Sequence, residues 1–401
     1  MRRNFWFLYN YFLINETRKL KRRPHVAVIA FLMPLLAWSV LSIAFVNGDV
    51  VEVPVVVVDY DGSELTRAIT NKLDAVESVC VALVTNDKSI ADSLIKSNKS
   101  FATIIFEPDF TKKIKQGKGG STDIVVNGFN MIYSKVLYKA IAQVLLDESK
   151  NIQIRRLVDK GFSKKEASLR ATPIITDIFA PGNPYFNYAI YLLPGMLLSI
   201  LQMSCSFAAI WVFREEKETA PGRITPRKGY KTPWLLARLT PIYLLSLMAA
   251  VILFSVFFPL LGIPINTGYG KIILLTNLYI IASIGMGSFL SLILSNLVTA
   301  AQALLVINAP SFVFSGYTFP RWAMPEAISK FAELIPLTHY LEAFFPLFLF
   351  GSNPERGYVQ LTIIALVIWA LIIILMGSVG SKMRDWFREV FQRREINSVT
   401  K

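Results

Sequence analysis

Residues 272–320 read IILLTNLYIIASIGMGSFLSLILSNLVTAAQALLVINAPSFVFSGYTFP and contain no Asp, Glu, Lys or Arg. A single helix over this stretch would be about 74 Å long at ~1.5 Å per residue, more than twice the ~30 Å hydrocarbon core of a bilayer. Ser295 and Asn296 form a polar break near its centre. The stretch therefore predicts two membrane spans joined by a tight turn.

Four further charge-free windows lie before and after this stretch, and each is long enough to cross a bilayer. The chain is 53% hydrophobic and only 17% charged, which excludes an ordinary soluble domain. The sequence thus predicts an α-helical polytopic membrane protein with six transmembrane helices. The predicted spans are residues 26–46, 185–212, 239–261, 272–293, 298–319 and 358–380.

Residues 335–350 are also apolar, but this stretch contains Glu342 and two prolines and is short for a span. We interpret residues 320–356 as an outer re-entrant segment. The six predicted spans carry no ionisable side chain, whereas ion-coupled carriers need such groups within the membrane. Energy for transport is therefore expected to enter through another protein.

Lys and Arg are concentrated before the first span, in the loop at residues 213–233 and in the tail. Because basic segments next to spans stay on the cytoplasmic side, both termini and this loop are predicted to be cytoplasmic. The net charge of +14 is then a sign of membrane topology, and nucleic-acid binding is disfavoured. The predicted parts are a cytoplasmic interfacial helix (1–24), the first span (25–46), an extracytoplasmic domain (47–184), the remaining five spans (185–380) and a basic cytoplasmic tail (381–401).

Residues 47–184 alternate between strand-like and helix-like patterns. They open with an apolar, β-branched run, VVEVPVVVVD at residues 50–59, and Asp61 or Ser63 is the expected N-cap of the next helix. The insertion is predicted to be a small α/β domain with its own core. Its further predicted elements are helices at 62–74, 87–96 and 130–160, strands at 78–84, 102–106 and 124–126, and a short helix starting at Pro108-Asp109.

Motifs that could carry chemistry are weak in this domain. Asp59 and Asp61 could hold a cation, but a strand end followed by a helix cap explains them better. Residues 117–122 (GKGGST) depart from a phosphate loop, because Lys112 and Gly119 stand where Gly and Ser or Thr are required, and we interpret them as a turn. Two Cys and two His exclude a disulfide framework and a transition-metal site. No metal site, bound cofactor or catalytic group is predicted for this chain.

Four stretches together resemble one membrane protein family. Residues 58–63 (VDYDGS) end the first strand of the outer domain, and residues 188–195 (YAIYLLPG) open the second span. Residues 214–219 (REEKET) with Thr225-Pro226 form an inner segment, and residues 315–338 contain SGYTFP, MP and IPLT. In this order and spacing, the chain resembles a permease subunit of the ABC-2 type exporters, in the branch with a large extracytoplasmic domain between the first and second spans.

The resemblance implies a dimer with a second permease copy or a paralogue, in the lipid bilayer of the bacterial cytoplasmic (inner) membrane. It also implies a separate ATPase subunit that binds ATP and Mg²⁺. A periplasmic adaptor is compatible with the resemblance but is not implied by it. The family usually has Gly-Thr after the acidic pair, whereas this chain has Ala-Pro-Gly after Thr219, so the geometry of the inner segment stays open. The residues implied in coupling to the ATPase are Arg214, Glu215, Glu216, Glu218, Thr219 and Pro226.

Polar side chains in spans two and five need partners in a bilayer, so they predict either cavity lining or hydrogen bonds between helices. Span four carries a stripe of small residues. We interpret this stripe as a surface for close helix packing, with a wall of the substrate path as the second interpretation. Glycine and proline residues after span five interrupt the helical pattern and predict an outer gate. Glu333, His339 and Glu342 are expected at the rim of this gate. The cavity candidates are Asn187, Gln202, Ser204, Thr299, Gln302 and Asn308; the stripe is Ser283, Gly287, Ser291 and Ser295; the gate candidates are Gly316, Pro320, Pro325 and Pro336.

The leading hypothesis is a permease that moves an amphipathic or lipid-like compound outward, because a neutral lining suits such a ligand better than an ion. The alternative is a non-transporting receptor or anchor whose outer domain binds a ligand or partner, although a single span would suffice for anchoring. A membrane enzyme is disfavoured, because no catalytic residues cluster in the sequence. A neighbouring reading frame for an ATP-binding cassette subunit would favour transport over the alternatives.

The predicted topology can be tested by labelling introduced cysteines. Cysteines placed at Lys118 and Ser352 should react with a membrane-impermeant reagent from outside the cell, because both lie in predicted outer segments. Cysteines placed at Arg223 and Ser398 should react only after the membrane is opened. Labelling of Ser398→Cys from outside would contradict the six-span topology.

Overall fold

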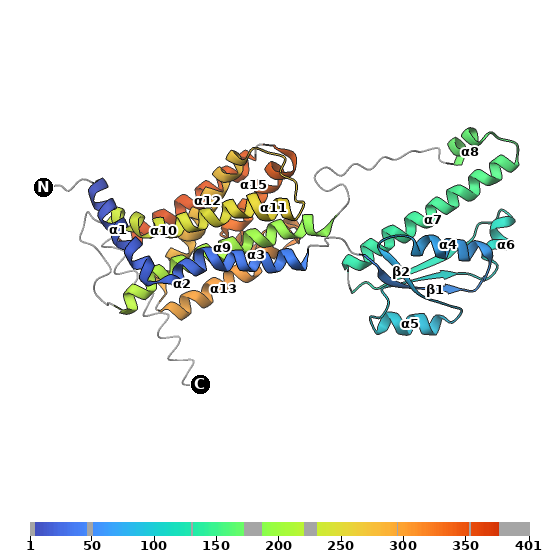
Figure 1. Ribbon diagram of the computed structural model, residues 1–401, viewed down its shortest axis with the longest axis horizontal. Coiled ribbons are helices and arrows are strands. Elements are labelled where there is room, and N and C mark those ends of the chain that lie inside the picture. Colours follow the sequence, from blue (N-terminus) through green and yellow to red (C-terminus); the bar gives the residue numbers. More distant parts are fainter. Residues whose placement is uncertain are drawn as a thin grey trace. The chain divides into compact units, whose positions relative to one another are not determined.

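A computed structural model describes residues 5–45, 51–129, 131–171, 187–219, 231–294, 296–352 and 354–376. The chain divides into two compact units, a helical one from residues 1–48 and 180–401 and an α/β one from residues 49–179 (Figure 1). The α/β unit is inserted between the first and second candidate spans, as the sequence predicts.

Six helical segments of the described chain are long and apolar enough to cross a membrane, which confirms the predicted number. The third begins at Lys231, eight residues before the predicted start at 239. The predicted break at Ser295-Asn296 falls between the fourth and fifth segments. The segments are Pro24–Ala44, Ala189–Phe213, Lys231–Leu260, Tyr269–Ile293, Leu297–Phe314 and Glu355–Met376.

The helical unit begins with α1 and ends, within the described residues, with α16. In Figure 1, α1 and α15 lie at opposite ends of this helix bundle. Its elements are α1 (Phe5–Arg22), α2 (Pro24–Ala27), η1 (Val28–Leu32), α3 (Met33–Ala44), α9 (Tyr188–Thr219), α10 (Lys231–Ile252), η2 (Leu253–Phe257), α11 (Phe258–Leu260), α12 (Tyr269–Ile293), α13 (Leu297–Phe314), η3 (Arg321–Ala323), α14 (Glu326–Ala332), α15 (Pro336–Phe350) and α16 (Glu355–Met376).

Two of the candidate spans contain a short π-helical turn, and each turn lies just before a proline. The π-helix η1 precedes Pro34, and the π-helix η2 precedes Pro259. Proline has no N–H to donate to the carbonyl four residues earlier, and in a bilayer no water replaces that bond. In each turn the N–H of the residue before the proline donates five residues back, Met33 to Val28 and Phe258 to Leu253, and the helices continue past both prolines.

Helices α9 and α12 pack so closely that one contact has room only for glycine. A Cβ atom added at Gly287 would lie 2.1 Å from the carbonyl oxygen of Ser206. The Ser206 hydroxyl donates a hydrogen bond to the Ser283 carbonyl at 2.8 Å. Ser283 and Gly287 therefore act in helix packing, as the stripe predicts, and Ser291 is also buried. Ser295, the last member of the stripe, lies outside the described residues.

Two aromatic side chains join neighbouring helices to the backbone of α9. The indole N–H of Trp38 on α3 donates to the Leu197 carbonyl at 2.9 Å, and the Tyr279 hydroxyl on α12 donates to the Leu198 carbonyl at 2.8 Å. Both side chains are fully buried. Each therefore satisfies its polar atom inside the apolar core, where an unpaired donor would be costly.

The α/β unit contains a four-stranded mixed sheet with the strand order β2-β1-β3-β4. Strand β1 is parallel to β2 and β3, and β4 is antiparallel to β3. The predicted strands and helices of this unit are all present, with ends shifted by a few residues. The elements are β1 (Val53–Asp59), α4 (Glu64–Asp74), β2 (Val79–Thr85), α5 (Lys88–Lys96), β3 (Ala102–Phe106), α6 (Phe110–Lys115), β4 (Thr122–Val126), α7 (Met131–Asp159) and α8 (Lys164–Ala171).

The central residues of strand β1, Val55 to Val58, are all apolar and buried because helices cover both faces of the sheet. Val55 and Val57 pack in one core with residues of α4, α6 and α7, and Val56 and Val58 pack against α5 on the other face. Figure 1 shows the same arrangement, with α5 on one side of the sheet and α4 and α7 on the other. A strand covered on both sides loses the apolar-polar alternation of a half-exposed strand.

The acidic pair after β1 belongs to a helix cap. The carboxylate of Asp59 accepts hydrogen bonds from the Asp61 and Gly62 N–H groups and from the Thr66 hydroxyl, at 2.7–3.0 Å. Ser63 is the N-cap of α4 and forms a capping box with Thr66. Burial acts to raise the pKa of Asp61, but hydrogen bonds from Thr111 and Ser63 outweigh it and hold this pKa below 3.8. Both carboxylates thus already have donors, which favours the helix cap over a cation site.

The separate core of the α/β unit predicts independent folding. Residues 50–175 expressed alone should be soluble and unfold cooperatively. The change Ile104→Ala, at a fully buried position of β3, should lower the free energy of unfolding by about 2–5 kcal/mol. Val125→Ala on the neighbouring strand β4 is the control, because this side chain is 40% exposed and should cost much less. Urea denaturation measures the free energy of unfolding of both variants. An aggregated or unfolded product from residues 50–175 would contradict the prediction that the unit folds on its own.

Candidate functional site

The predicted coupling segment begins as a continuation of a membrane helix. Helix α9 runs without interruption from Tyr188 to Thr219, so residues 214–219 form its last turns and are not part of a loop. Pro226 and the rest of the segment up to residue 230 lie outside the described residues. A force applied to residues 214–219 would therefore act directly on the helix that forms the centre of the bundle.

A buried arginine joins this end of α9 to two other helices. Arg238 on α10 is only 1% exposed, and its guanidinium donates to the carbonyl of Val212 on α9. The guanidinium also lies 3.8 Å from the carboxylate of Glu16 on α1, and Glu16 is in turn 2.9 Å from Lys19. The charges of Glu16 and Arg238 compensate each other where neither can be hydrated.

Two aromatic rings complete the surroundings of this arginine. The guanidinium carbon of Arg238 lies 4.9 Å from the ring centre of Trp234 and 5.3 Å from that of Phe213. Guanidinium groups stack favourably on such rings when water is excluded. We call Glu16, Phe213, Trp234 and Arg238 the Arg238 junction; it holds α1, α9 and α10 together directly before the coupling segment.

The Arg238 junction corrects the prediction that no span contains an ionisable residue. The charge-free window begins at Leu239 only because Arg238 interrupts it, whereas the helix itself begins at Lys231. One signal in the sequence could have indicated a partner, since Glu16 is the only acidic residue among the many bases of residues 1–24. A lone acid in a basic segment is a candidate for a buried ion pair.

Helix α1 has two different sides, which agrees with the predicted interfacial helix without testing it. One side contacts α10, where the Tyr9 and Thr240 hydroxyls are 3.0 Å apart. The other side exposes Trp6, Phe7 and Tyr11. Exposed aromatic side chains beside a basic cluster are typical of helices that lie in the membrane interface.

The structure brings two of the six cavity candidates together. The side-chain amide of Gln202 on α9 donates to the side-chain Oδ1 atom of Asn308 on α13, and Gln202 Oε1 accepts from the N–H of Leu337 at 2.8 Å. Both side chains are buried, as is Ser204. In this conformation Gln202 and Asn308 bond helices to one another, and a role in lining a substrate path stays a prediction.

The other cavity candidates lie apart from this pair. Asn187 accepts a hydrogen bond from the Ile190 N–H at the start of α9. Thr299 lies in the first turn of α13, where its N–H donates to Asn296, and Gln302 is exposed on the same helix. The six residues therefore do not form one site within a single copy of the chain.

The predicted outer gate is a series of short helices, and its prolines lie at their starts. Pro320 and Pro325 precede η3 and α14, and Pro336 is the first residue of α15. This placement suits proline, because the first N–H groups of a helix have no partner within it. Gly316 has a φ of +87°, and a Cβ atom there would lie 2.7 Å from the Arg321 side chain. The gate role itself stays a prediction.

Polar contacts hold the gate segment together. Arg321 lies 2.8 Å from Glu333 and 3.7 Å from Glu342. His339 is buried, with its Nε2 atom 2.8 Å from the Glu333 carbonyl oxygen and its Nδ1 atom 3.4 Å from the Gln360 side chain. These contacts bring the three rim residues into one network. Within the described residues, no group of three His, Cys, Asp or Glu could hold a metal ion.

Two motif stretches far apart in the sequence meet at the start of α9. A Cβ atom at Gly195 would lie 2.5 Å from the ring of Phe312, so glycine allows α13 and Tyr317 to approach closely. The Tyr317 ring stacks on Phe345 with centres 4.4 Å apart, and the Tyr191 hydroxyl donates to the Tyr317 carbonyl. The Pro-Gly opening of the second span thus packs against the Ser-Gly-Tyr stretch after the fifth.

Six candidate spans and an inserted α/β unit define a multi-pass α-helical membrane protein. The chain belongs to the family described as ABC-2 family transporter protein, whose pattern matches residues 26–379. This membership confirms the family resemblance that the four sequence stretches carry.

Curated relatives are transport proteins. The chain is 23% identical over 353 residues to the "Probable multidrug ABC transporter permease YbhS" of Escherichia coli K12, covering 85% of this chain and 88% of the relative; the O157:H7 strain gives the same values. It is 21% identical over 316 residues to "ABC transporter G family member 20" of Dictyostelium discoideum, covering 75% of this chain and 40% of the relative. The family and the E. coli relatives agree with the predicted location in the bacterial inner membrane.

The Arg238 junction predicts a large loss of stability when its charge is removed. The change Arg238→Met should lower the free energy of unfolding by roughly 2–3 kcal/mol, because it removes the guanidinium's contacts to Glu16, to the Val212 carbonyl and to two aromatic rings while Lys19 still pairs with Glu16. Lys19→Met is the control, because Lys19 is 30% exposed and its ion pair should contribute little. Thermal unfolding of the purified full-length protein in detergent measures both. Equal melting temperatures for Arg238→Met and the unmodified protein would contradict this role.

Proposed function

We propose that the chain is the membrane-spanning subunit of an ATP-binding cassette exporter and moves an amphipathic or lipid-like compound outward. ATP is hydrolysed in a separate subunit, which contacts residues 214–219. The observation that carries this proposal is the single course of α9, which extends from the buried Gln202 to the charged turns after Phe213. A receptor or anchor would need one span, so six candidate spans favour transport.

Helix α9 is suited to carry motion from the ATPase into the membrane. Its charged end offers Arg and Glu side chains for ion pairs with a partner surface. The Arg238 junction makes α1 and α10 move with this end, because Arg238 is bonded to the Val212 carbonyl of α9, stacks on Phe213 and pairs with Glu16 of α1. At Gln202 the same helix is bonded to α13 and to the start of α15, next to the proposed gate. Closure of the ATPase subunits would thus act on the gate through one helix.

The chemistry of the helical unit supports an amphipathic substrate. Its core contains stacked aromatic side chains, such as Tyr279 on Tyr340 with ring centres 4.2 Å apart. Its buried polar groups are mostly neutral amides and hydroxyls. Such a mixture suits an apolar compound with a few polar groups. The E. coli relatives, which are named as multidrug permeases, support the same substrate class.

The transporter contains a second permease copy or a paralogue. Apolar side chains remain exposed along α13 and α16, including Val306, Val313, Ile363 and Leu366. Lipid or a second permease can cover these faces. Only Gln202 and Asn308 of the six cavity candidates meet within one chain, and Gln302 is exposed on α13, so a substrate path between two copies is consistent with their arrangement.

Charge reversal in the coupling segment tests the proposed energy input. The double change Glu215→Lys and Glu216→Lys should lower ATP hydrolysis by the complex and abolish export, because it places like charges against the ATPase surface. Losing one side of a buried charge pair at such a contact typically costs ~2–5 kcal/mol. ATPase activity and export are measured on the complex in membrane vesicles.

The matched control reverses two acids elsewhere on the predicted cytoplasmic side. Asp385→Lys with Glu389→Lys adds the same charge in the tail and should leave export unchanged. A compensating reversal on the ATPase surface should restore part of the activity of the first variant. Normal export by the Glu215→Lys, Glu216→Lys variant would show that the coupling lies elsewhere.

A further inference from the structure

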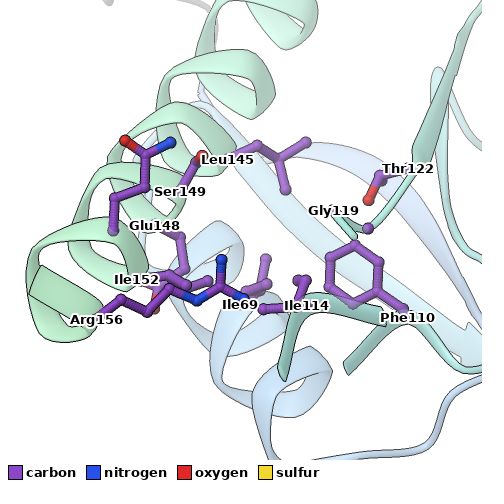
Figure 2. A pocket seen from close by; sticks show the side chains of 12 residues that line it. Ile69, Phe110, Ile114, Gly119, Thr122, Leu145, Glu148, Ser149, Ile152 and Arg156 are labelled. Carbon is purple, nitrogen blue, oxygen red and sulfur yellow. The ribbon is translucent and has the colours of Figure 1, made fainter. Parts of the chain in front are cut away.

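The α/β unit contains a cavity of about 310 Å³ between α4, α6, α7 and the turn that precedes β4 (Figure 2). Its walls are part apolar and part polar. The apolar side chains are Ile69 from α4, Phe110 and Ile114 from α6, and Leu145 and Ile152 from α7. The polar side chains are Thr122, Glu148, Ser149, Gln153 and Arg156. This volume is at the lower end of the range for small-molecule sites in proteins. The cavity can therefore hold a small organic molecule.

Three charged side chains belong to this region, and their charges do not cancel. Glu148 on α7 lines the cavity, is only 5% exposed and forms an ion pair with Lys72 on α4. Arg156, two turns further along α7, also lines the cavity. The pair of Lys72 and Glu148 is neutral, so Arg156 leaves one positive charge at the cavity.

Arg156 retains hydrogen-bonding capacity that the protein does not use. Its Nη2 atom is buried and has no hydrogen-bond partner among the described residues. Figure 2 shows this side chain reaching from α7 across the cavity toward Ile69. A buried guanidinium donor without an acceptor is costly, and an anion placed in the cavity would remove that cost with a charge-assisted hydrogen bond.

The glycine turn at residues 117–120 shapes the cavity wall. Gly119 has a φ of +77°, which favours glycine, and a Cβ atom at Gly120 would lie 2.5 Å from the Phe110 ring. Both glycines line the cavity. The stretch that departs from the phosphate-loop pattern thus has a different role: its lack of side chains lets the backbone close directly over an aromatic ring.

We propose that this cavity binds an amphipathic organic anion, with one carboxylate on Arg156 and an apolar body against Phe110, Ile114 and Leu145. The planar guanidinium matches a carboxylate with two parallel hydrogen bonds. An amphipathic anion fits this mixed lining better than inorganic phosphate, because its apolar body also buries surface against Phe110, Ile114 and Leu145. This binding site is distinct from the proposed export path and does not depend on ATP.

The test uses the full-length protein in nanodiscs of zwitterionic lipid, with octanoate and its uncharged counterpart octanamide as probes in equilibrium dialysis. Binding to empty nanodiscs is subtracted. We expect saturable octanoate binding at about one site per chain. Arg156→Gln should weaken octanoate binding about tenfold or more and leave octanamide binding unchanged, because only the carboxylate needs the guanidinium. Arg156→Lys, which keeps the charge, should restore part of the affinity.

Two further variants separate a specific site from general effects. Arg155→Gln is the matched control, because Arg155 is the exposed neighbour on α7 and does not line the cavity; it should leave octanoate binding unchanged. Ser149→Trp places a large ring at the exposed edge of the cavity and should abolish binding of both probes.

Three results would overturn the proposal. The first is the absence of saturable octanoate binding to the unmodified protein up to about 5 mM, where even a weak ligand of this size should bind. The second is an equal loss of octanoate and octanamide binding in Arg156→Gln, which would indicate an apolar patch. The third is full displacement of octanoate by equimolar inorganic phosphate, which would indicate a phosphate site.

Discussion

The close packing of α9 against α12 is the constraint on which the helical unit depends. Gly287 leaves no room for a side chain beside the Ser206 carbonyl, and the Ser206 hydroxyl bonds the facing backbone at Ser283. Association of helices in a bilayer depends on such contacts, because lipid is as apolar as the helix surfaces. Trp38 and Gln202 then attach α3 and α13 to the same helix. Helix α9 is thereby the central element through which the parts of the bundle can act on one another.

Buried charge is used differently in the two units. In the helical unit, Arg238 is surrounded by a carbonyl, a carboxylate and two aromatic rings, so its charge serves to hold three helices together. In the α/β unit, Arg156 keeps one buried donor without a partner and lines a cavity. Arg238 likewise has one buried donor, Nε, that makes no hydrogen bond to a described residue, but it is packed among three helices. The cavity at Arg156 has a volume of about 310 Å³ and the one at Arg238 only about 20 Å³, so of the two only Arg156 has room for a ligand beside it.

Much of the fold could be predicted because its signals are local. The strands at β1 and β3 follow from β-branched runs, and the N-cap was predicted as Asp61 or Ser63, of which the structure has Ser63. The coupling segment was predicted as a loop because charged residues end the apolar window at Phe213, but α9 continues to Thr219. The cavity candidates Gln202 and Asn308 were singled out correctly as polar groups that need partners, and only the structure identified each as the partner of the other.

The sequence by itself determined the number of candidate spans, the inserted α/β unit and the family, since charge-free windows, strand patterns and motifs are each contained in short stretches of chain. The tertiary structure alone decided that Arg238 pairs with Glu16 and that Arg156 faces a cavity walled by α4, α6 and α7. The physical reason is that a membrane helix is apolar on every side, so its sequence does not reveal which face meets which neighbour. Contacts between residues far apart in the chain depend on helix rotation and packing, which only the folded chain fixes.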